Sequence, residues 1–181
     1  MADLFDRAPP AGDPQPQTTR PLADRIRPAR LADVVGQGKV MGPDGPLGAM
    51  LGSGSLSSLI LWGPPGVGKT TIARLLARET DLAFVQISAI FSGVPELRKV
   101  FDSARLRRQQ GRGTLLFVDE IHRFNKAQQD SFLPHMEDGT ITLVGATTEN
   151  PSFELNAALL SRAQVIVLER LSLADLELLA Q

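Results

Sequence analysis

The sequence predicts an α/β fold in which a five-stranded parallel sheet lies between two layers of helices. Three observations indicate it. Short apolar segments alternate with helical patterns along residues 59–168, which is the rhythm of strands joined by helical crossovers. A glycine-rich loop follows the first apolar segment, and an acidic pair follows the third. Both are typical of ligand sites at the carboxyl edge of a parallel sheet.

The chain before the first strand carries little to bury. Residues 1–20 are rich in Pro, Asp, Gln and Ala, so we expect a disordered tail. Within it, Asp3-Leu4-Phe5 resembles part of the peptides that dock on bacterial sliding clamps, although their glutamine is missing; a terminus without a partner is the alternative. A glycine-rich segment from Leu31 is expected to hold a short helix near residues 47–51.

The first strand, Leu59–Trp62, leads into Gly63-Pro-Pro-Gly-Val-Gly-Lys69-Thr70, which has the spacing of a P-loop. Its glycines can adopt positive φ and let backbone N–H groups approach phosphate oxygens. Lys69 is placed to contact the β- and γ-phosphates, and the Thr70 hydroxyl to ligate Mg²⁺. The helical pattern over residues 71–78 adds its positive dipole end. We assign the contacts with ATP to Gly63, Pro64, Pro65, Gly66, Val67, Gly68, Lys69, Thr70 and Thr71.

The second strand is expected over Ala83–Ser88 and a helix over Val94–Gln110. Arg98, Arg105 and Arg112 recur every seven residues, so they would share one side of this helix. Either this basic strip contacts DNA phosphates, which would make binding salt-dependent, or it is a solvated helix face. The other members of the strip are Lys99, Arg107 and Arg108.

The third strand, Thr114–Val118, is apolar throughout, as expected for a strand buried on both faces. Asp119 and Glu120 follow it at the sheet edge that also carries the P-loop. Asp119 is then placed to hold Mg²⁺ through Thr70 and water, and Glu120 to orient and polarise the attacking water. A solvated acidic pair in a loop is the alternative.

The fourth strand, Ile141–Ala146, ends in Thr147-Thr148-Glu149-Asn150. A hydroxyl at this rim can sense the γ-phosphate; we choose Thr148, with Thr147 as the second choice and a plain turn as the alternative. Between the third and fourth strands we expect a helix over Lys126–Glu137. We expect His122 and His135 to be polar residues satisfied locally, without a catalytic role.

Arg162 closes a short helical segment just before the last apolar run, Val165–Leu168. An arginine there can project from the domain edge. In an oligomer it could reach the γ-phosphate of a neighbour and stabilise the charge of the transition state. A surface arginine without this role is the alternative.

In this order, the motifs resemble those of AAA+ ATPases of the clamp-loader and Holliday-junction-motor branch. Four segments resemble more closely the replication-associated recombination protein A family, whose eukaryotic relative is the Werner helicase interacting protein. The resemblance runs from about Pro21 to the end of the chain. The four segments are residues 60–66, 117–126, 128–134 and 145–156.

The resemblance implies a three-layer αβα core whose ATP hydrolysis depends on DNA, at stalled or gapped replication forks, in recombination and repair. The implied partners are DNA forks, gaps or ends, further copies of the chain forming a tetramer, and a single-strand-binding protein or sliding clamp. Gln37 lies in a segment that matches the region against the adenine base, and Ser88 where related ATPases keep a polar residue that restrains the catalytic glutamate. Lys39-Val40 stands where the family often has His-Leu.

We therefore expect a tail over residues 1–20, an ATPase core over 21–170 and the start of a helical lid over 171–181. The family's remaining lid and oligomerisation domain are expected to be missing, so hydrolysis by this chain is expected to be weak. Two alternatives stay open. One is a clamp-loader-like subunit, and the other is a nucleotide-gated module that binds DNA or protein with little hydrolysis.

Composition limits the remaining classes. With 181 residues, 43% of them hydrophobic, and a net charge of −1, the chain can bury one sizeable core, and any nucleic-acid binding must come from a local patch. The absence of cysteine excludes disulfides and thiol chemistry within the chain. There is no apolar run of membrane-spanning length and no export pattern, so we expect a cytoplasmic, nucleoid-associated protein without a membrane partner.

Overall fold

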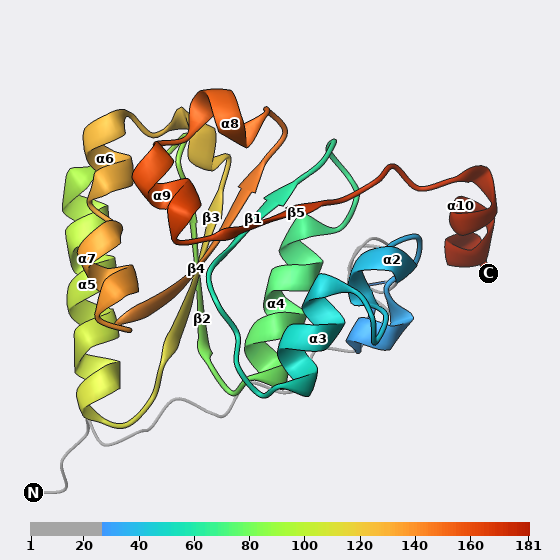
Figure 1. Cartoon of the computed structure of the whole chain (residues 1–181), viewed down its shortest axis with the longest axis horizontal. Coiled ribbons are helices and arrows are strands. Elements are labelled where there is room, and N and C mark those ends of the chain that lie inside the picture. Colours follow the sequence, from blue (N-terminus) through green and yellow to red (C-terminus); the bar gives the residue numbers. More distant parts are fainter. Residues whose placement is uncertain (1–26) are drawn as a thin grey trace, which may run out of the picture.

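The computed structural model describes residues 27–181. Within them, five strands form one sheet in the order β2-β3-β4-β1-β5, and every neighbouring pair is parallel (Figure 1). The strands are β1 (Leu59–Trp62), β2 (Ala83–Ser88), β3 (Thr114–Asp119), β4 (Ile141–Thr147) and β5 (Gln164–Val167). The predicted five-stranded parallel sheet is confirmed. The predicted tail over residues 1–20 lies outside the described residues.

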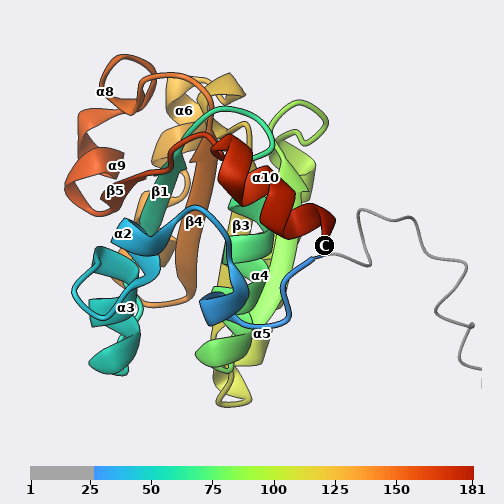
Figure 2. The same ribbon diagram turned by 90° about the vertical axis from the view of Figure 1, so that its right-hand side faces the viewer.

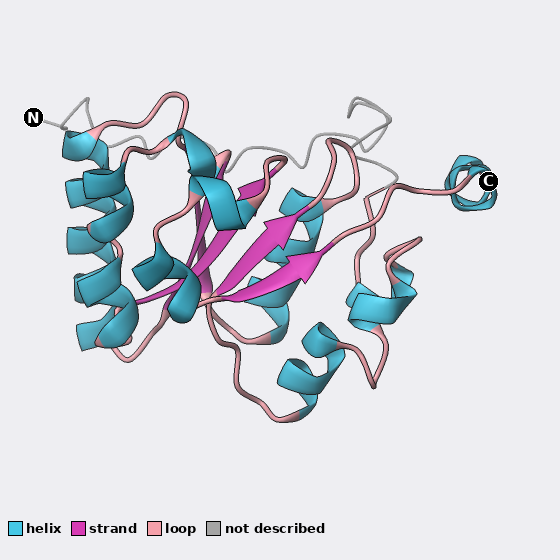
Figure 3. Ribbon diagram, turned by 45° about the horizontal axis from the view of Figure 1, so that its top comes forward, coloured by secondary structure: helices cyan, strands magenta, loops and turns pink. Residues whose placement is uncertain are grey.

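Helices cover both faces of this sheet (Figures 1 and 3). One face carries η2 (Leu31–Asp33), α2 (Gly38–Met41), α3 (Pro46–Gly52) and α4 (Lys69–Glu79). The other carries α5 (Val94–Gln109), α6 (Lys126–Asp130), α7 (Leu133–Glu137) and α9 (Ala157–Ser161). Short elements follow the strand ends: η3 (Ile121–Arg123), α8 (Pro151–Glu154) and α10 (Leu173–Ala180). The architecture is the predicted three-layer sandwich.

The pleat of the strands explains why the sheet has two cores. Leu115 and Phe117 of β3 pack in the cluster under α4, whereas Leu116 and Val118 pack in the cluster under α5. All four side chains are fully buried, because successive residues of a strand point to opposite faces and both faces carry helices. The uninterrupted apolar sequence of β3 is therefore a consequence of its central position.

Two helices differ from the sequence prediction. The helix expected over residues 126–137 is divided into α6 and α7. Phe132, between them, is fully buried against Phe101 and Phe124, and Pro134 has no N–H to continue a helical ladder from α6. The helix α5 ends at Gln109, before the left-handed Gly111 with φ +82°. Arg112 thus lies beyond the helix, and its predicted place in the basic strip is wrong.

The parallel arrangement gathers the carboxyl ends of all strands at one edge of the sheet. The P-loop follows β1 there, Glu120 follows β3, and Thr147 ends β4. The last helix, α10, stands apart from the sheet and buries none of its residues (Figures 1 and 2), but Leu171 and Leu179 line a cavity with Gly66 and Thr71 of the P-loop side. Among the described residues, no helix combines the length and apolar character needed to cross a membrane.

Candidate nucleotide-binding site

The loop between β1 and α4 has the backbone of a phosphate cradle. Gly66 and Gly68 adopt φ of +79° and +97°, values that side-chain-bearing residues rarely adopt. No atom lies within 4 Å of where a Cβ would stand at either glycine, so the space above the loop is open. Gly63 is required for packing instead, because a Cβ there would lie 2.7 Å from the carbonyl oxygen of Leu168.

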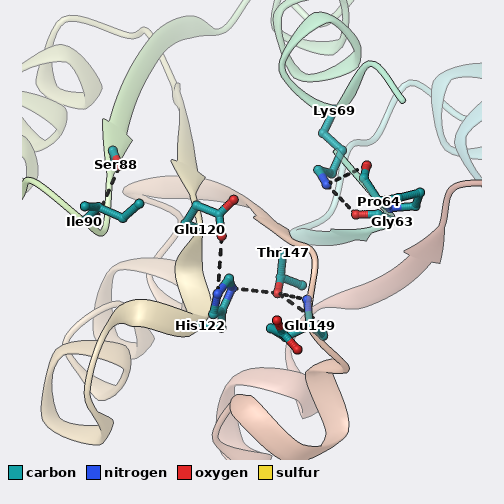
Figure 4. Close-up of polar contacts among 9 residues, drawn as sticks. All are labelled: Gly63, Pro64, Lys69, Ser88, Ile90, Glu120, His122, Thr147 and Glu149. Atoms are coloured by element: carbon teal, nitrogen blue, oxygen red, sulfur yellow. Dashed lines mark hydrogen bonds and ion pairs between the residues drawn. The ribbon is translucent and has the colours of Figure 1, made fainter. Parts of the chain in front are cut away.

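Lys69 begins α4 and turns its side chain back over this loop. Its Nζ donates to the carbonyl oxygens of Gly63, at 2.5 Å, and Pro64, at 3.2 Å (Figure 4). Burial lowers the pKa of Lys69, while the carboxylates of Glu120 and Asp119 act in the opposite direction. The structure therefore brings the predicted phosphate-binding ammonium and both predicted carboxylates into one electrostatic environment.

Glu120 stands in an unusual backbone conformation. Its φ is +54° and its ψ 43°, in the left-handed region, which is uncommon for a residue other than glycine. Such strain is retained in proteins chiefly where the surrounding structure and the function hold it. The turn directs the side chain, which is 29% exposed, to the carboxyl edge of the sheet.

Three polar side chains at this edge form a chain of contacts (Figure 4). Glu120 Oε2 lies 3.3 Å from His122 Nε2, and His122 Nδ1 lies 2.9 Å from Thr147 Oγ1. Thr147 Oγ1 also accepts a hydrogen bond from the Glu149 N–H at 3.0 Å. The prediction that His122 is a locally satisfied polar residue is confirmed, and its partners are Thr147 and the predicted catalytic glutamate. The same prediction for His135 is wrong, because its buried Nδ1 has no hydrogen-bond partner among the described residues.

The expected restraint of Glu120 by Ser88 is wrong. Ser88 Oγ accepts a hydrogen bond from the Ile90 N–H at 3.3 Å, whereas the Glu120 carboxylate lies against His122 (Figure 4). Sequence reasoning missed this contact because it depends on the left-handed turn at Glu120 and on β3 pairing with β4. The one available signal was the position of His122, two residues after the glutamate.

The donor atoms at this edge fit Mg²⁺. Residues 27–181 contain no cluster of three or more His, Cys, Asp or Glu side chains that could hold a metal ion by themselves. The half-buried Thr70 hydroxyl and Asp119 carboxylate instead offer two oxygen ligands. This suits Mg²⁺, which keeps several waters and is held by one or two protein oxygens together with substrate phosphates.

Gln37 has a structural contact that the sequence did not reveal. It is buried, its Nε2 donates to the Glu169 carbonyl at 2.8 Å, and its Oε1 accepts from the Glu169 N–H at 3.3 Å. These bonds tie the segment before α2 to the segment after β5. Beside them lies a cavity of about 130 Å³. Its lining includes Pro28, Val34, Val35, Gly68 and Leu171.

The two remaining predicted site residues, Thr148 and Arg162, differ in how they lie relative to the edge of the sheet that carries Lys69 and Glu120. Thr148 follows the last residue of β4 directly and is half-buried, next to the fully buried Thr147. Arg162 lies farther out, at the end of α9 beside the edge strand β5. Its guanidinium pairs with Glu137 at 2.5 Å and donates to the Ala158 carbonyl at 2.9 Å. Within its own chain Arg162 therefore contacts surface partners.

Comparisons with known proteins agree with this geometry. The family model for ATPases associated with various cellular activities (AAA) matches residues 59–171, which run from β1 to just before α10. Among solved structures, the RuvB Holliday junction branch migration motor of Thermotoga maritima superposes with a TM-score of 0.71 and 32% identity, covering 85% of this chain and 52% of that one.

Relatives with similar sequences are longer proteins. Replication-associated recombination protein A of Escherichia coli (strain K12) is 57% identical over 160 residues, which cover 88% of this chain and 36% of the relative. ATPase WRNIP1 of Dictyostelium discoideum is 48% identical over 159 residues, covering 88% of this chain and 18% of the relative. The chain thus spans about a third or less of these relatives.

The predicted resemblance is confirmed by these relatives, and the predicted ATPase type by the family model. The chain belongs to the AAA family of ATPases, and within that family it is similar to replication-associated recombination protein A.

Proposed function

We propose that this chain is the ATPase core of a DNA-dependent enzyme that acts at stalled or gapped replication forks, in recombination and repair. The observation that carries the proposal is the meeting of Lys69, Asp119 and Glu120 at the carboxyl edge of the sheet. The names of relatives such as replication-associated recombination protein A support the setting in replication and recombination.

The chain's own groups divide the work of hydrolysis. Backbone N–H groups of the P-loop and the Lys69 ammonium bind the phosphates, and Thr70 and Asp119 hold Mg²⁺. When bound, Mg²⁺ neutralises charge on the β- and γ-phosphates. Glu120 orients and polarises the attacking water, and the neighbouring Thr148 hydroxyl senses the γ-phosphate.

The cavity beside the P-loop suits the adenine base. Its walls are largely apolar and come from three parts of the chain: the segment before α2, the P-loop and the region of α10. We assign Gln37 a structural role, in which its hydrogen bonds with Glu169 stabilise one side of this cavity. A direct contact between Gln37 and the nucleotide stays a prediction. Since Leu171 and Leu179 close one side, residues 171–181 act as the first part of a lid.

A second copy of the chain supplies Arg162. The strand β5 forms an edge of the sheet, and it exposes Val165 by 39% and Val167 by 55%. Exposed apolar side chains beside a projecting arginine fit a boundary between subunits better than a free surface. At that boundary Arg162 leaves Glu137 and stabilises charge on the neighbour's transferring phosphate.

The contacts of the basic strip of α5 favour a solvated helix face over a surface that contacts DNA. Arg105 pairs with Asp102 at 3.0 Å, Arg108 with Asp138 at 3.9 Å, and Arg107 donates to Thr114 at 3.2 Å. Partners within the chain already neutralise or engage these side chains, which favours the alternative of a solvated helix face. The proposed DNA dependence therefore rests on the relatives' names. The proposed location on the nucleoid has the same support.

The test is ATP turnover of the 181-residue chain with and without forked or gapped DNA, over a range of protein concentrations. The proposal predicts turnover that DNA stimulates and that rises more than linearly with protein concentration. Turnover indifferent to DNA would contradict the DNA dependence. Tight nucleotide binding with negligible turnover would favour the nucleotide-gated module instead.

A further inference from the structure

We propose that His122 is a positioning residue that couples the catalytic Glu120 to Thr147, the residue before the γ-phosphate sensor Thr148. The inference rests on the proposed function. It adds a relay, by which we mean the contacts from Thr147 through His122 to Glu120, that sets the orientation of the Glu120 carboxylate after β3 according to the position of the end of β4. The relay has three members: Glu120 in the turn after β3, His122 in η3 and Thr147 at the end of β4 (Figure 4).

Burial makes these contacts specific. The His122 side chain is 8% exposed and Thr147 is 1% exposed, while Glu120 keeps 29% of its side chain open to solvent. The relay thus begins at a buried residue and ends at the partly exposed carboxylate that is proposed to contact the attacking water. Polar groups buried in this way are expected to be hydrogen-bonded and to hold one arrangement.

The chemistry of the groups fixes the direction of the relay for a neutral imidazole. An ionised carboxylate can only accept hydrogen bonds, so the ring proton is on Nε2, facing Glu120. Nδ1 is then an acceptor for the Thr147 hydroxyl at 2.9 Å, in competition with the Glu149 carbonyl oxygen, which lies 3.2 Å from the same hydroxyl. The same hydroxyl oxygen accepts from the Glu149 N–H, which fixes Thr147 to the backbone beside Thr148.

The lengths of the contacts indicate which of them shortens when ATP binds. The Thr147–His122 contact is 2.9 Å and the Thr147–Glu149 contact 3.0 Å, whereas the His122–Glu120 contact is 3.3 Å. The longest contact is the one to the catalytic group, and such contacts tighten when the reacting complex forms. A displacement of Thr148 by the γ-phosphate would move its neighbour Thr147, and through His122 it would set the orientation of Glu120.

Amide replacements of His122 test the relay. The amide of Gln reaches the place of Nε2 and can still donate to Glu120, whereas the shorter Asn reaches only the place of Nδ1. We expect His122→Asn to lower kcat at least tenfold with KM changed less than twofold. His122→Gln keeps the donor to Glu120 but not the acceptor for Thr147, so it should recover part of kcat and not all of it. His135 belongs to α7 and stacks on Phe101 of α5, so His135→Gln is the control for substituting a histidine and should leave kcat unchanged.

Thr147 provides the second half of the test. Thr147→Val should lower kcat by a similar factor, Thr147→Ser should restore it, and His122→Asn combined with Thr147→Val should be no slower than either single variant, because both remove one relay. Equal kcat for His122→Asn and His122→Gln, or multiplying effects in the double variant, would overturn the proposal. Thermal melting of each variant separates unfolding from misplacement.

A readout without hydrolysis separates this inference from the proposed function. At a pH where the His122 ring is neutral, its ¹⁵N resonances should report the tautomer with the proton on Nε2, and Thr147→Val should shift the Nδ1 resonance. A proton on Nδ1, or an Nδ1 resonance that ignores Thr147→Val, would refute the relay even in an active enzyme. Absent turnover with the expected resonances would refute only the proposed function.

Discussion

At the scale of single residues, two residues with side chains adopt a left-handed backbone conformation that glycine adopts with less strain. Among the described residues, Asp81 and Glu120 are the two non-glycine residues with positive φ, and both have a φ of +54°. Asp81 is exposed in the turn before β2, whereas Glu120 lies in the site. The same backbone strain therefore occurs once without an assigned role and once at the proposed catalytic carboxylate.

Replacing each residue by Gly and by Ala measures this strain. At both positions we expect the Gly variant to have a free energy of unfolding about 1 kcal/mol above that of the Ala variant, because Ala keeps the strained φ. Urea unfolding measures the difference. Both Glu120 variants should lose turnover and both Asp81 variants keep it. A Gly variant no more stable than its Ala counterpart at Glu120 would contradict the strained turn.

His135 gives the protein a dependence on pH. It is buried and stacks on Phe101 with ring centroids 4.0 Å apart. Burial lowers the pKa of His135 from its usual 6.5, and the nearby Arg105 lowers it further, against smaller opposing effects of Asp138 and Asp102. Below about pH 6.5 His135 is therefore protonated in the unfolded chain while it is still neutral in the folded chain. The free energy of unfolding consequently falls as the pH falls through about 6.5.

We expect His135→Gln to reduce this loss of stability. Urea unfolding of the wild type and the variant at pH 7.5 and 5.5 measures it, since the other titrating groups are common to both proteins. The variant should lose less free energy of unfolding between the two pH values. An equal loss in both proteins would show that His135 titrates normally in the folded state.

Residue identities and spacing predicted that Lys69, Thr70, Asp119 and Glu120 lie at one edge of the sheet, because motif chemistry is local. Their roles in hydrolysis stay predictions. Residue identities and spacing did not predict the His122–Thr147 contact, which joins residues 25 positions apart. That contact exists because β3 and β4 are neighbours in the sheet and because Glu120 turns the chain to the left-handed region. Strand order and a strained turn are properties of the assembled fold.

At the scale of elements, the division between α6 and α7 is the clearest departure from the sequence prediction. The helical pattern across residues 126–137 could not show that burying the Phe132 side chain stabilises the fold more than one continuous helix would. The start of α6 is fixed by a capping box, in which Asn125 Oδ1 accepts from the Gln128 N–H at 2.8 Å and Gln128 Oε1 from the Asn125 N–H at 3.0 Å.

Removing this cap should weaken the layer that supports η3. We expect Asn125→Ala to lower the free energy of unfolding by about 1 kcal/mol, and Asn125→Asp, which keeps a capping oxygen, to lower it by less. Urea unfolding of the three proteins measures the difference. Equal losses for Ala and Asp would mean that the cap does not stabilise α6.

At the scale of the whole molecule, Arg162 links one chain to the next. A surface ion pair such as Arg162–Glu137 contributes about 0–1 kcal/mol to stability, so breaking it from either side should hardly change unfolding. An arginine that acts on a neighbour's phosphate contributes on the order of 10³ or more to turnover. The two roles of the same side chain can therefore be separated.

We expect Arg162→Ala to abolish turnover at protein concentrations where the wild type is active, and Glu137→Ala, which breaks the same ion pair, to retain it. Mixing Arg162→Ala with Lys69→Ala should restore part of the activity, because one variant supplies the arginine and the other the intact site. Turnover by Arg162→Ala at the wild-type rate, or none in the mixture, would contradict a role across the subunit boundary.

The most direct test of the account compares Glu120→Gln with the wild type for both ATP affinity and the rate of phosphate release with Mg²⁺. If Lys69, Thr70, Asp119 and Glu120 form one hydrolytic site, the variant binds ATP within about threefold of the wild type and releases phosphate at least a hundredfold more slowly. Phosphate release at the wild-type rate would show that the carboxylate at the end of β3 does not orient the attacking water.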